Sequence, residues 1–313
     1  MTAAFDGPIL FFGGPYGNAH ATRALLAEAA RLGVPPTNIV CTGDVIAYCA
    51  EPSETIALLR DAGVRVVQGN CDAQIGAGAE DCGCGFEEGS LCDSLSAAWF
   101  GFARERVGAD DKAWLAALPP RLDVTLGGRR LAVIHGGVER NNTFIFGSTP
   151  VPEMLAEFAQ LDCDGVVAGH CGLPFTRVIH GRLWHNPGVI GMPANDGTAS
   201  VWFSMVSDEP MGLRILHRRL DYDAAGAAAA MREASLTRHY ADALVSGLWP
   251  SMDVLPFPER RRAGEPLSPG DVLWAGGPAD GPLWPVPHEA AARRNAPSSG
   301  GEHDVCSTQT EKP

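Results

Sequence analysis

Residues 38–52 read NIVCTGDVIAYCAEP, and this stretch contains the pattern that decides the fold. The apolar run 38–41 is typical of a buried strand, and it stops at Gly43-Asp44. Pro52 then suits the first turn of a helix. A buried strand, a polar loop and a helix in this order form the first part of a βαβ unit, whose two strands are parallel.

The same arrangement is found on both sides of this stretch. Residues 8–12 form an apolar run that stops at Gly13-Gly14, and residues 64–67 form another that stops at Gly69-Asn70. Between the first two runs lies a segment with one apolar helical face, which Asn18 can cap. Strands that alternate with helices predict an α/β fold with a largely parallel sheet.

Later in the chain the pattern changes to that of antiparallel strands. A hairpin is expected over residues 122–134, because two apolar runs flank Gly127-Gly128. Residues 166–168 predict one more buried strand. Further strands, joined by short turns, are expected at 176–179, 200–206 and 213–220. We therefore expect a second sheet packed on the first.

Composition divides the chain into three regions. Residues 1–220 contain the expected sheets, interrupted by a Gly- and Cys-rich insert at 73–92. Residues 221–259 are Ala-rich and predict a helical C-terminal extension. Pro and Gly dominate residues 260–313, where we expect a poorly ordered tail.

The charge balance narrows the classes of partner. The 313 residues include 24 Lys and Arg against 37 Asp and Glu, which gives a net charge of −13. Nucleic acids and anionic membranes bind clustered basic residues, so we expect neither as a stable partner. Because no apolar stretch reaches about 18 residues and residues 1–7 contain no Lys or Arg, we expect a cytoplasmic protein. The sequence does not indicate the oligomeric state.

Nine cysteines, an odd number, are spread through the chain. In a reducing compartment we expect thiols, metal ligands or buried apolar residues in place of disulfides. The cysteines of the insert could also pair with one another.

Four apolar runs have a glycine and a polar side chain at their ends: Gly43-Asp44, Gly69-Asn70, His135-Gly136 and Gly169-His170. Strand ends of an α/β sheet meet at one edge, where ligands bind. A carboxylate, an amide and two imidazoles suit a divalent or trivalent ion such as Mn, Fe or Zn. We therefore expect Asp44, Asn70, His135 and His170 to hold a metal ion.

The order of these motifs resembles that of the calcineurin-like metallophosphoesterases, in particular their small bacterial branch. The family's Gly-Asp-x-x-x-Tyr-x-x-x-Pro, Gly-Asn-His-Asp/Glu, Val-x-His-Gly and Gly-His-Thr-His-x-Pro correspond to residues 43–52, 69–72, 133–136 and 169–174, and its Asn-Pro-Gly to 186–188. The resemblance covers about residues 8 to 220. It implies a two-sheet αββα sandwich and a hydrolytic site with two metal ions.

The sequence departs from this family at the ligands of the first metal. The family's Asp-x-His-Gly-Asn reads Gly14-Pro15-Tyr16-Gly17-Asn18 here, and the second His of the last motif is Gly172. Of the first metal's ligands only Asp44 is retained, which bridges both metals in the family. By the same correspondence of motifs, all ligands of the second metal are present: Asp44, Asn70, His135 and His170. Cys71 stands where the family has a His that assists the leaving group or the phosphate.

Other residues could complete the site. Tyr16 could bind ferric iron as a phenolate, although a packing role is the reading we favour. Sulfur ligands would select Zn, Cu(I) or an iron–sulfur centre, and the candidates are Cys71, Cys82, Cys84, Cys92 and Cys171. Arg140 is the candidate for binding phosphate oxygens, because its planar guanidinium suits them; a solvated surface position is the alternative.

These observations lead to three hypotheses. The first is a metal-dependent hydrolase of the phosphoesterase class with a rearranged site, in which metal-bound water attacks a small-molecule phosphoester and Cys71 or Asp72 assists the leaving group. The second is a thiolate-supported redox or sulfur-chemistry metalloprotein on the same fold. The third is a non-catalytic binding homologue.

Overall fold

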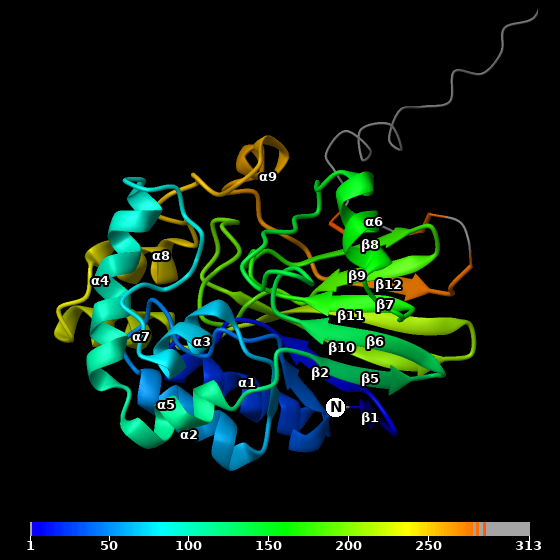
Figure 1. Ribbon diagram of the computed structural model, residues 1–313, viewed down its shortest axis with the longest axis horizontal. Coiled ribbons are helices and arrows are strands. Elements are labelled where there is room, and N and C mark those ends of the chain that lie inside the picture. Colours follow the sequence, from blue (N-terminus) through cyan, green and yellow to red (C-terminus); the bar gives the residue numbers. More distant parts are fainter. Residues whose placement is uncertain (1, 278–279, 282–283, 286–313) are drawn as a thin grey trace, which may run out of the picture.

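The computed structural model describes residues 2–277, 280–281 and 284–285, and its strands form two sheets (Figure 1). The first sheet contains β2 (Ile9–Phe12), β3 (Ile39–Cys41), β4 (Arg65–Val66), β10 (Val201–Glu209), β11 (Gly212–Leu220) and β12 (Gly270–Trp274). The second contains β1 (Thr2–Ala4), β5 (Leu122–Leu126), β6 (Arg129–Ile134), β7 (Gly165–Ala168), β8 (Phe175–Ile179) and β9 (Arg182–Asn186). The strand orders are β12-β11-β10-β2-β3-β4 and β1-β5-β6-β7-β9-β8.

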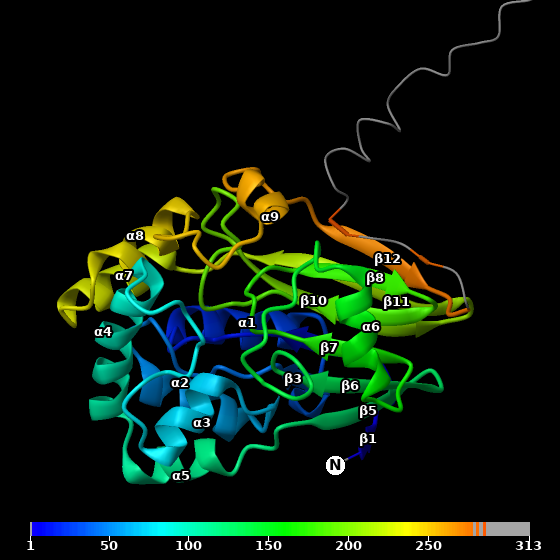
Figure 2. The ribbon, with the colours of Figure 1, turned by 45° about the horizontal axis from the view of Figure 1, so that its top comes forward.

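The helices are distributed unequally between the two sheets (Figures 1 and 2). Apolar residues of most helices share one core with the first sheet: α1 (Ala19–Arg31), α2 (Pro52–Ala62), α3 (Asn70–Ala77), α4 (Leu91–Arg106), α5 (Ala109–Ala116), α7 (Ala224–Glu233) and α8 (Arg238–Ser246). On the second sheet, α6 (Val151–Ala159) packs against the face that carries Trp184. A 3₁₀ helix (Pro36–Asn38) precedes β3, and the short α9 (Phe257–Arg261) precedes β12.

Strand β2 explains why an uninterrupted apolar run marks this fold. Ile9 and Phe11 point into the core between the two sheets, and Leu10 and Phe12 point into the core under the helices. All four side chains are fully buried, because the strand has a covered face on both sides. The two-sheet αββα sandwich expected from the sequence is therefore confirmed.

The strand directions bring several loops together. In the first sheet β2, β3 and β4 run parallel, and in the second sheet β6, β7 and β9 do so. The pairs β10–β11 and β8–β9 are antiparallel, as their short turns predict. The loops that follow β3, β6 and β7 carry three of the four expected ligands.

Two stretches differ from the sequence-based prediction. The insert expected as a loop over 73–92 is helical at its start, because α3 continues to Ala77, and α4 already begins at Leu91. The sequence-based prediction also leaves out strand β9 and helix α6, although the buried Met154 and Phe158 of α6 are spaced i, i+4 on one helical face.

The prediction of a poorly ordered tail from residue 260 is wrong for residues 270–274. They form β12, which pairs antiparallel with β11 at the edge of the first sheet. The side chains alternate as in a half-buried strand: Val272 and Trp274 are buried, and Leu273 is exposed. The Pro- and Gly-rich flanks concealed this period of two. Residues 286–313 of the expected tail lie outside the described residues.

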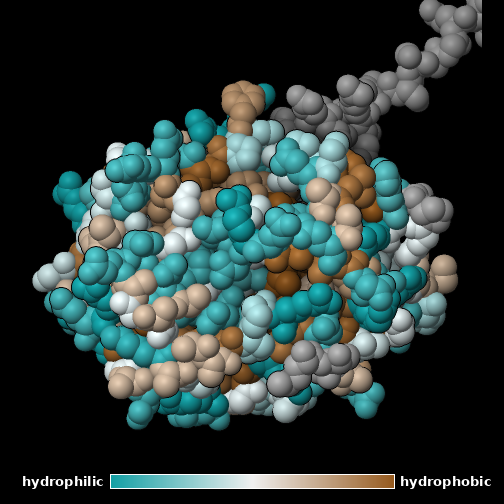
Figure 3. Space-filling view, in the orientation of Figure 1, coloured by the Kyte–Doolittle hydropathy of each residue, from teal (hydrophilic) through white to brown (hydrophobic). Residues whose placement is uncertain are grey.

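The hydrophilic surface agrees with the proportion of charged residues in the sequence, which is 19%. The face shown in Figure 3 is mostly hydrophilic, with hydrophobic residues visible in places between the polar ones. Among the helices that the structure describes, none has the length and apolar character needed to cross a bilayer.

Trp274 should be important for stability. Its ring is 1% exposed in the core between the sheets, and its Nε1 donates to the Gly181 carbonyl at 3.0 Å. We expect Trp274→Ala to lower the free energy of unfolding by about 3–5 kcal/mol, as for other buried Trp truncations. Urea denaturation of the full chain measures this. The matched control is Leu273→Ala, which should change it by less than about 0.5 kcal/mol. Equal effects of the two variants would contradict the packing of β12.

Candidate metal centre

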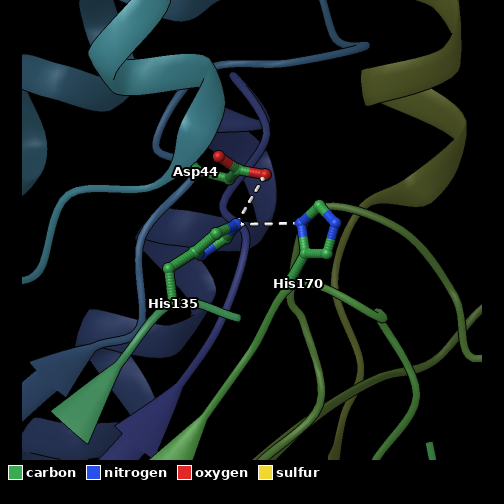
Figure 4. A group of neighbouring side chains, drawn as sticks. All are labelled: Asp44, His135 and His170. Carbon is green, nitrogen blue, oxygen red and sulfur yellow. Dashed lines mark hydrogen bonds and ion pairs between the residues drawn. The ribbon is translucent and has the colours of Figure 1, made fainter. Parts of the chain in front are cut away.

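The four expected ligands come from four separate segments and meet between the two sheets. Asp44 lies in the loop after β3, and Asn70 is the first residue of α3. His135 directly follows β6, and His170 lies two residues beyond β7. Figure 4 shows Asp44, His135 and His170 with their polar atoms turned toward one another.

His135 is at the centre of the group. Its Nε2 lies 3.2 Å from Asp44 Oδ2, 3.1 Å from Asn70 Oδ1 and 3.1 Å from His170 Nδ1. The ligand atoms of Asp44, His135 and His170 all lie within 4.8 Å of one another. All four residues are less than 10% exposed. Buried polar atoms therefore converge on one point.

Partners outside the group orient three of the four ligand residues toward that point. His135 Nδ1 lies 2.7 Å from the Thr42 carbonyl oxygen, which can only accept, so Nδ1 carries a proton. Asn70 Nδ2 donates to the Cys82 carbonyl oxygen at 3.0 Å, which turns Oδ1 inward. Asp44 Oδ1 accepts from the Cys71 backbone N–H at 3.0 Å, leaving Oδ2 for the centre. Such outer partners typically fix the ligands of a metal.

The charge at this point must be positive. When Nε2 of His135 has no proton, four lone-pair atoms face each other inside the protein, which is unfavourable. Burial lowers the pKa of His135, but the charge and hydrogen bond of Asp44, the Thr42 carbonyl and the charge of Asp72 together raise it, so the net shift is upward. A proton on Nε2 then acts as the shared donor to its neighbours. A metal ion in the same place satisfies the same atoms.

His170 differs from His135 in its protonation. Burial and the neighbouring His135 lower the pKa of His170 to about 3, so its ring is neutral at physiological pH. A neutral imidazole is the form that binds metals. Its Nε2 is buried and has no hydrogen-bond partner within the described residues. His170 Nδ1 is the nitrogen that faces the centre, and together with the inward-facing atoms of Asp44, Asn70 and His135 it forms a donor set that fits a bound cation.

Two glycines make this close approach possible. A Cβ at Gly43 would lie 2.9 Å from His135 Nδ1 and 2.7 Å from the Gly69 nitrogen. A Cβ at Gly69 would collide with the Asp44 carboxylate. The Gly-Asp and Gly-Asn pairs of the sequence thus place their polar residues where no larger neighbour fits.

Asp72 positions the site and does not face it. Its Oδ2 accepts from the backbone N–H groups of Asp44 at 2.8 Å and Gly69 at 2.9 Å, and its Oδ1 accepts from Val45 at 2.9 Å. These three bonds tie the loop after β3 to the start of α3. Burial raises the pKa of Asp72 to about 7, with a contribution from the Asp44 charge. The carboxylate is fully buried, so the predicted role in assisting a leaving group does not fit this geometry.

The cysteines of the insert lie beside the group without contributing to it. Cys82 and Cys84 form a disulfide, which agrees with the alternative that cysteines of the insert pair with one another. Cys71 Sγ lies 3.9 Å from Cys84 Sγ, and burial raises the pKa of the Cys71 thiol. Cys92 and Cys171 are unpaired. In the described part of the chain, Asp44, His135 and His170 are the only group of three or more His, Cys, Asp or Glu residues that could hold an ion, and it contains no sulfur.

Aromatic rings cover the two glycines that stand where the resemblance implies ligands of a first metal. A Cβ at Gly14 would collide with the ring of Tyr16. A Cβ at Gly172 would lie 3.2 Å from the indole of Trp249. Tyr16 is 5% exposed and packs edge-on against Tyr48, with ring centroids 4.9 Å apart. Burial raises the pKa of Tyr16 well above its usual value, so its hydroxyl keeps its proton and is a poor ligand.

A cavity adjoins the candidate metal centre, and Asp44 and His170 are part of its wall. Most of the other lining residues are aromatic or aliphatic, and Cys84, Cys92 and Cys171 are also among them. Sequence reasoning missed the contribution of Trp249 and its neighbours, because no motif marks the C-terminal extension. Arg140 is exposed and is not among the lining residues, so the structure does not bring it to the site.

Comparison with known proteins gives consistent results. The family model described as the calcineurin-like phosphoesterase superfamily domain matches residues 17–209. The uncharacterized protein MJ0912 of Methanocaldococcus jannaschii is 21% identical over 223 residues, which is 66% of this chain and 85% of that protein.

Two solved structures share the fold. A metallophosphoesterase from Sphaerobacter thermophilus is 23% identical with a TM-score of 0.60, and the match covers 77% of this chain and 99% of that one. The hypothetical protein PH1004 from Pyrococcus horikoshii OT3 is 17% identical with a TM-score of 0.66, and the match covers 80% and 100%.

The first prediction for this site concerns metal binding. We expect the chelator-treated protein to bind one Mn²⁺ per chain, and His135→Ala to weaken binding by at least about 100-fold. Loss of an outer partner alone costs about 10–100-fold, and His135 is central to the group. Isothermal titration calorimetry measures the stoichiometry and the affinity. His239→Ala, at an exposed His, is the matched control. Unchanged binding in His135→Ala would contradict the assignment.

The second prediction concerns pH. Below the raised pKa of His135, a metal ion must displace the proton from Nε2, so apparent affinity should fall about tenfold for each pH unit. Above that pKa the affinity should level off. Mn²⁺ titrations between about pH 5 and about pH 8, with proton release followed in weak buffer, test this. An affinity that does not change over that range would show that no imidazolium competes with the ion.

Proposed function

Because this chain belongs to the calcineurin-like phosphoesterase superfamily, we propose that it is a metal-dependent phosphoesterase that uses a single ion at Asp44, Asn70, His135 and His170. The observation that carries the proposal is the convergence of three polar atoms on His135 Nε2 at 3.1–3.2 Å. A divalent ion at such a site lowers the pKa of water and stabilises charge on phosphoryl oxygens.

The residues of the chain have separate tasks in this proposal. Asp44, Asn70, His135 and His170 hold the ion in a buried position. The Thr42 carbonyl oxygen orients the ring of His135 through its bond to Nδ1. The Asp72 carboxylate holds the loop that carries Asp44 by accepting from the Asp44 backbone N–H. The cavity beside the ligands receives the ester. The metal, whether Mn, Fe or Zn, is not specified by this ligand set.

Assistance to the leaving group is weak in this arrangement. Cys71, which replaces the family's His, is buried and is not among the residues lining the cavity. Loss of a general acid typically lowers the rate by about 10²–10⁴-fold. We therefore propose that the enzyme acts on esters whose alcohol is a good leaving group.

The two alternative functions receive less support from the geometry. A sulfur-based metal centre needs free thiolates, but two of the five candidate cysteines are paired and none belongs to the ion-holding group. A binding homologue without metal has no evident use for the buried, converging lone pairs. The hydrolase accounts for them directly.

Activity provides the test of the proposed function. We expect hydrolysis of bis(p-nitrophenyl) phosphate that chelators abolish and Mn²⁺, Fe²⁺ or Zn²⁺ restores. Asp44→Asn should lower kcat/KM by at least about 10³-fold, because an ion contributes several kcal/mol to the transition state. The control is Asp223→Asn, which changes an exposed carboxylate at the N-cap of α7. Turnover that is equal in Asp44→Asn and the unchanged protein with every metal would refute the proposal.

A further inference from the structure

The wall of the cavity beside the candidate metal centre is unusually aromatic. Six rings line it in addition to His170: Tyr16, Tyr48, Phe86, Phe144, Tyr240 and Trp249. They come from the loops after β2, β3 and β6, from the insert, and from the C-terminal extension. Distant parts of the chain thus supply the same kind of side chain to one place, next to Asp44 and His170.

One of these rings stacks on a candidate ligand, and a second ring stacks on the first. Phe144 packs on the imidazole of His170, with centroids 4.2 Å apart. Phe86 stacks directly on Phe144, with ring centroids 6.5 Å apart and planes 28° apart. The two rings and the indole of Trp249 belong to the same cavity wall, against which a flat apolar group can pack. Offset stacking at such spacings is the favoured geometry of aromatic pairs.

The charge of the cavity limits the charge of its ligand. No Lys or Arg is found among its described lining residues, and Asp44 adds a negative charge. Arg140 is exposed elsewhere, and the whole chain carries −13. A phosphate monoester carries close to two negative charges at neutral pH, whereas a diester carries one. With one bound ion as the source of positive charge, the diester is the better match.

The polarity of the cavity limits the chemistry of the ester group. Apart from the two ligands, the polar side chains among the described lining are three tyrosines, one serine and the cysteines; no Asn or Gln is present. A nucleobase would leave its hydrogen-bonding edge largely unpaired here, which is costly. A hydrocarbon-like aryl ring has no such requirement, and its phenolate is a better leaving group than an alkoxide.

We propose that the preferred substrate is a singly charged phosphodiester with an aryl ester group, whose ring is seated among Phe86, Phe144 and Trp249. The inference rests on the proposed function. In the reaction, the bond between phosphorus and the aryl oxygen breaks and a bond between phosphorus and the water oxygen forms. One proton of that water is transferred to the departing aryl oxygen or to solvent. The products are a phosphomonoester and a phenol, and nothing is oxidised or reduced.

Three substrates with the same leaving group separate the effect of the second aryl ring from the effect of the substrate's charge. They are bis(p-nitrophenyl) phosphate, methyl p-nitrophenyl phosphate and p-nitrophenyl phosphate, assayed with Mn²⁺. We expect kcat/KM for the bis-aryl diester to exceed that for the methyl ester by at least tenfold, after division by the ratio of their uncatalysed rates. The monoester should be slower still. A fourth substrate, thymidine 5′-(p-nitrophenyl phosphate), presents a nucleoside in place of the second aryl group and should not exceed the bis-aryl diester.

Binding provides a readout that does not depend on turnover. Calorimetry should show that diphenyl phosphate binds at least tenfold more tightly than dimethyl phosphate to the Mn²⁺-loaded protein. Phe86→Leu keeps an apolar side chain but removes the flat ring, and it should lower this ratio by about 2–10-fold. Trp249→Leu should lower it similarly. Phe257→Ala, at a ring that is 71% exposed, is the matched control and should leave the ratio unchanged.

The outcomes separate this inference from the function on which it rests. If no substrate is hydrolysed above Asp44→Asn, the proposed function fails. If hydrolysis depends on Asp44 but aryl and methyl diesters are used and bound equally, the function stands and the aryl preference is overturned. Preference for the monoester or for the thymidine ester would also overturn it, as would an unchanged ratio in both ring variants.

Discussion

The requirement for positive charge at His135 Nε2 is the constraint on which the rest of the site depends. A carboxylate, an amide oxygen and a second imidazole approach this nitrogen to 3.1–3.2 Å in a place that water hardly reaches. Without a proton or a metal ion there, these lone pairs would repel one another in a medium of low dielectric. Outer hydrogen bonds hold Asp44, Asn70 and His135 in place, and Phe144 packs on the ring of His170.

The backbone around the ligands shows what this arrangement costs. Asp44 and His170 both have a left-handed backbone, with φ of 56° and 58°, which side-chain-bearing residues rarely adopt. Each such residue costs about 1–3 kcal/mol and persists where its surroundings determine it. For Asp44 the surroundings include Asp72, whose buried carboxylate binds the Asp44 backbone N–H. Two of the candidate ligands thus have a strained backbone, and a buried carboxylate holds one of them in place. Functional sites commonly contain such strain.

Aromatic packing covers the two glycines that stand where the family resemblance implies ligands of a first metal. Tyr16 lies over Gly14 and Trp249 lies over Gly172, so the two glycines and the two rings are complementary changes. The C-terminal extension contributes Trp249 to this packing. The indole Nε1 of Trp249 donates to the Pro193 carbonyl oxygen at 2.7 Å, and its backbone N–H donates to Asn195 Oδ1. The cavity beside these rings is available to the apolar part of a ligand.

The sequence alone determined the layered fold and the four converging residues. Strands buried on both faces, such as Ile9–Phe12, leave an uninterrupted apolar run, and strand-end glycines followed by polar residues mark the edge at which ligands gather. These signals are local, so they can be read from neighbouring residues. The alternation in β12 is equally local, but the surrounding Pro and Gly obscured it.

Only the tertiary structure decided the roles of Asp72, the cysteines, Arg140 and Trp249. Asp72 and Asp44 look alike in the sequence, yet one binds three backbone N–H groups and the other turns an oxygen to the centre. Trp249 lies 77 positions from Gly172 in the sequence and contacts the space above it only after the chain has folded. The physical reason is that a side chain's role depends on which atoms are within a few ångströms of it, and long-range packing sets those distances.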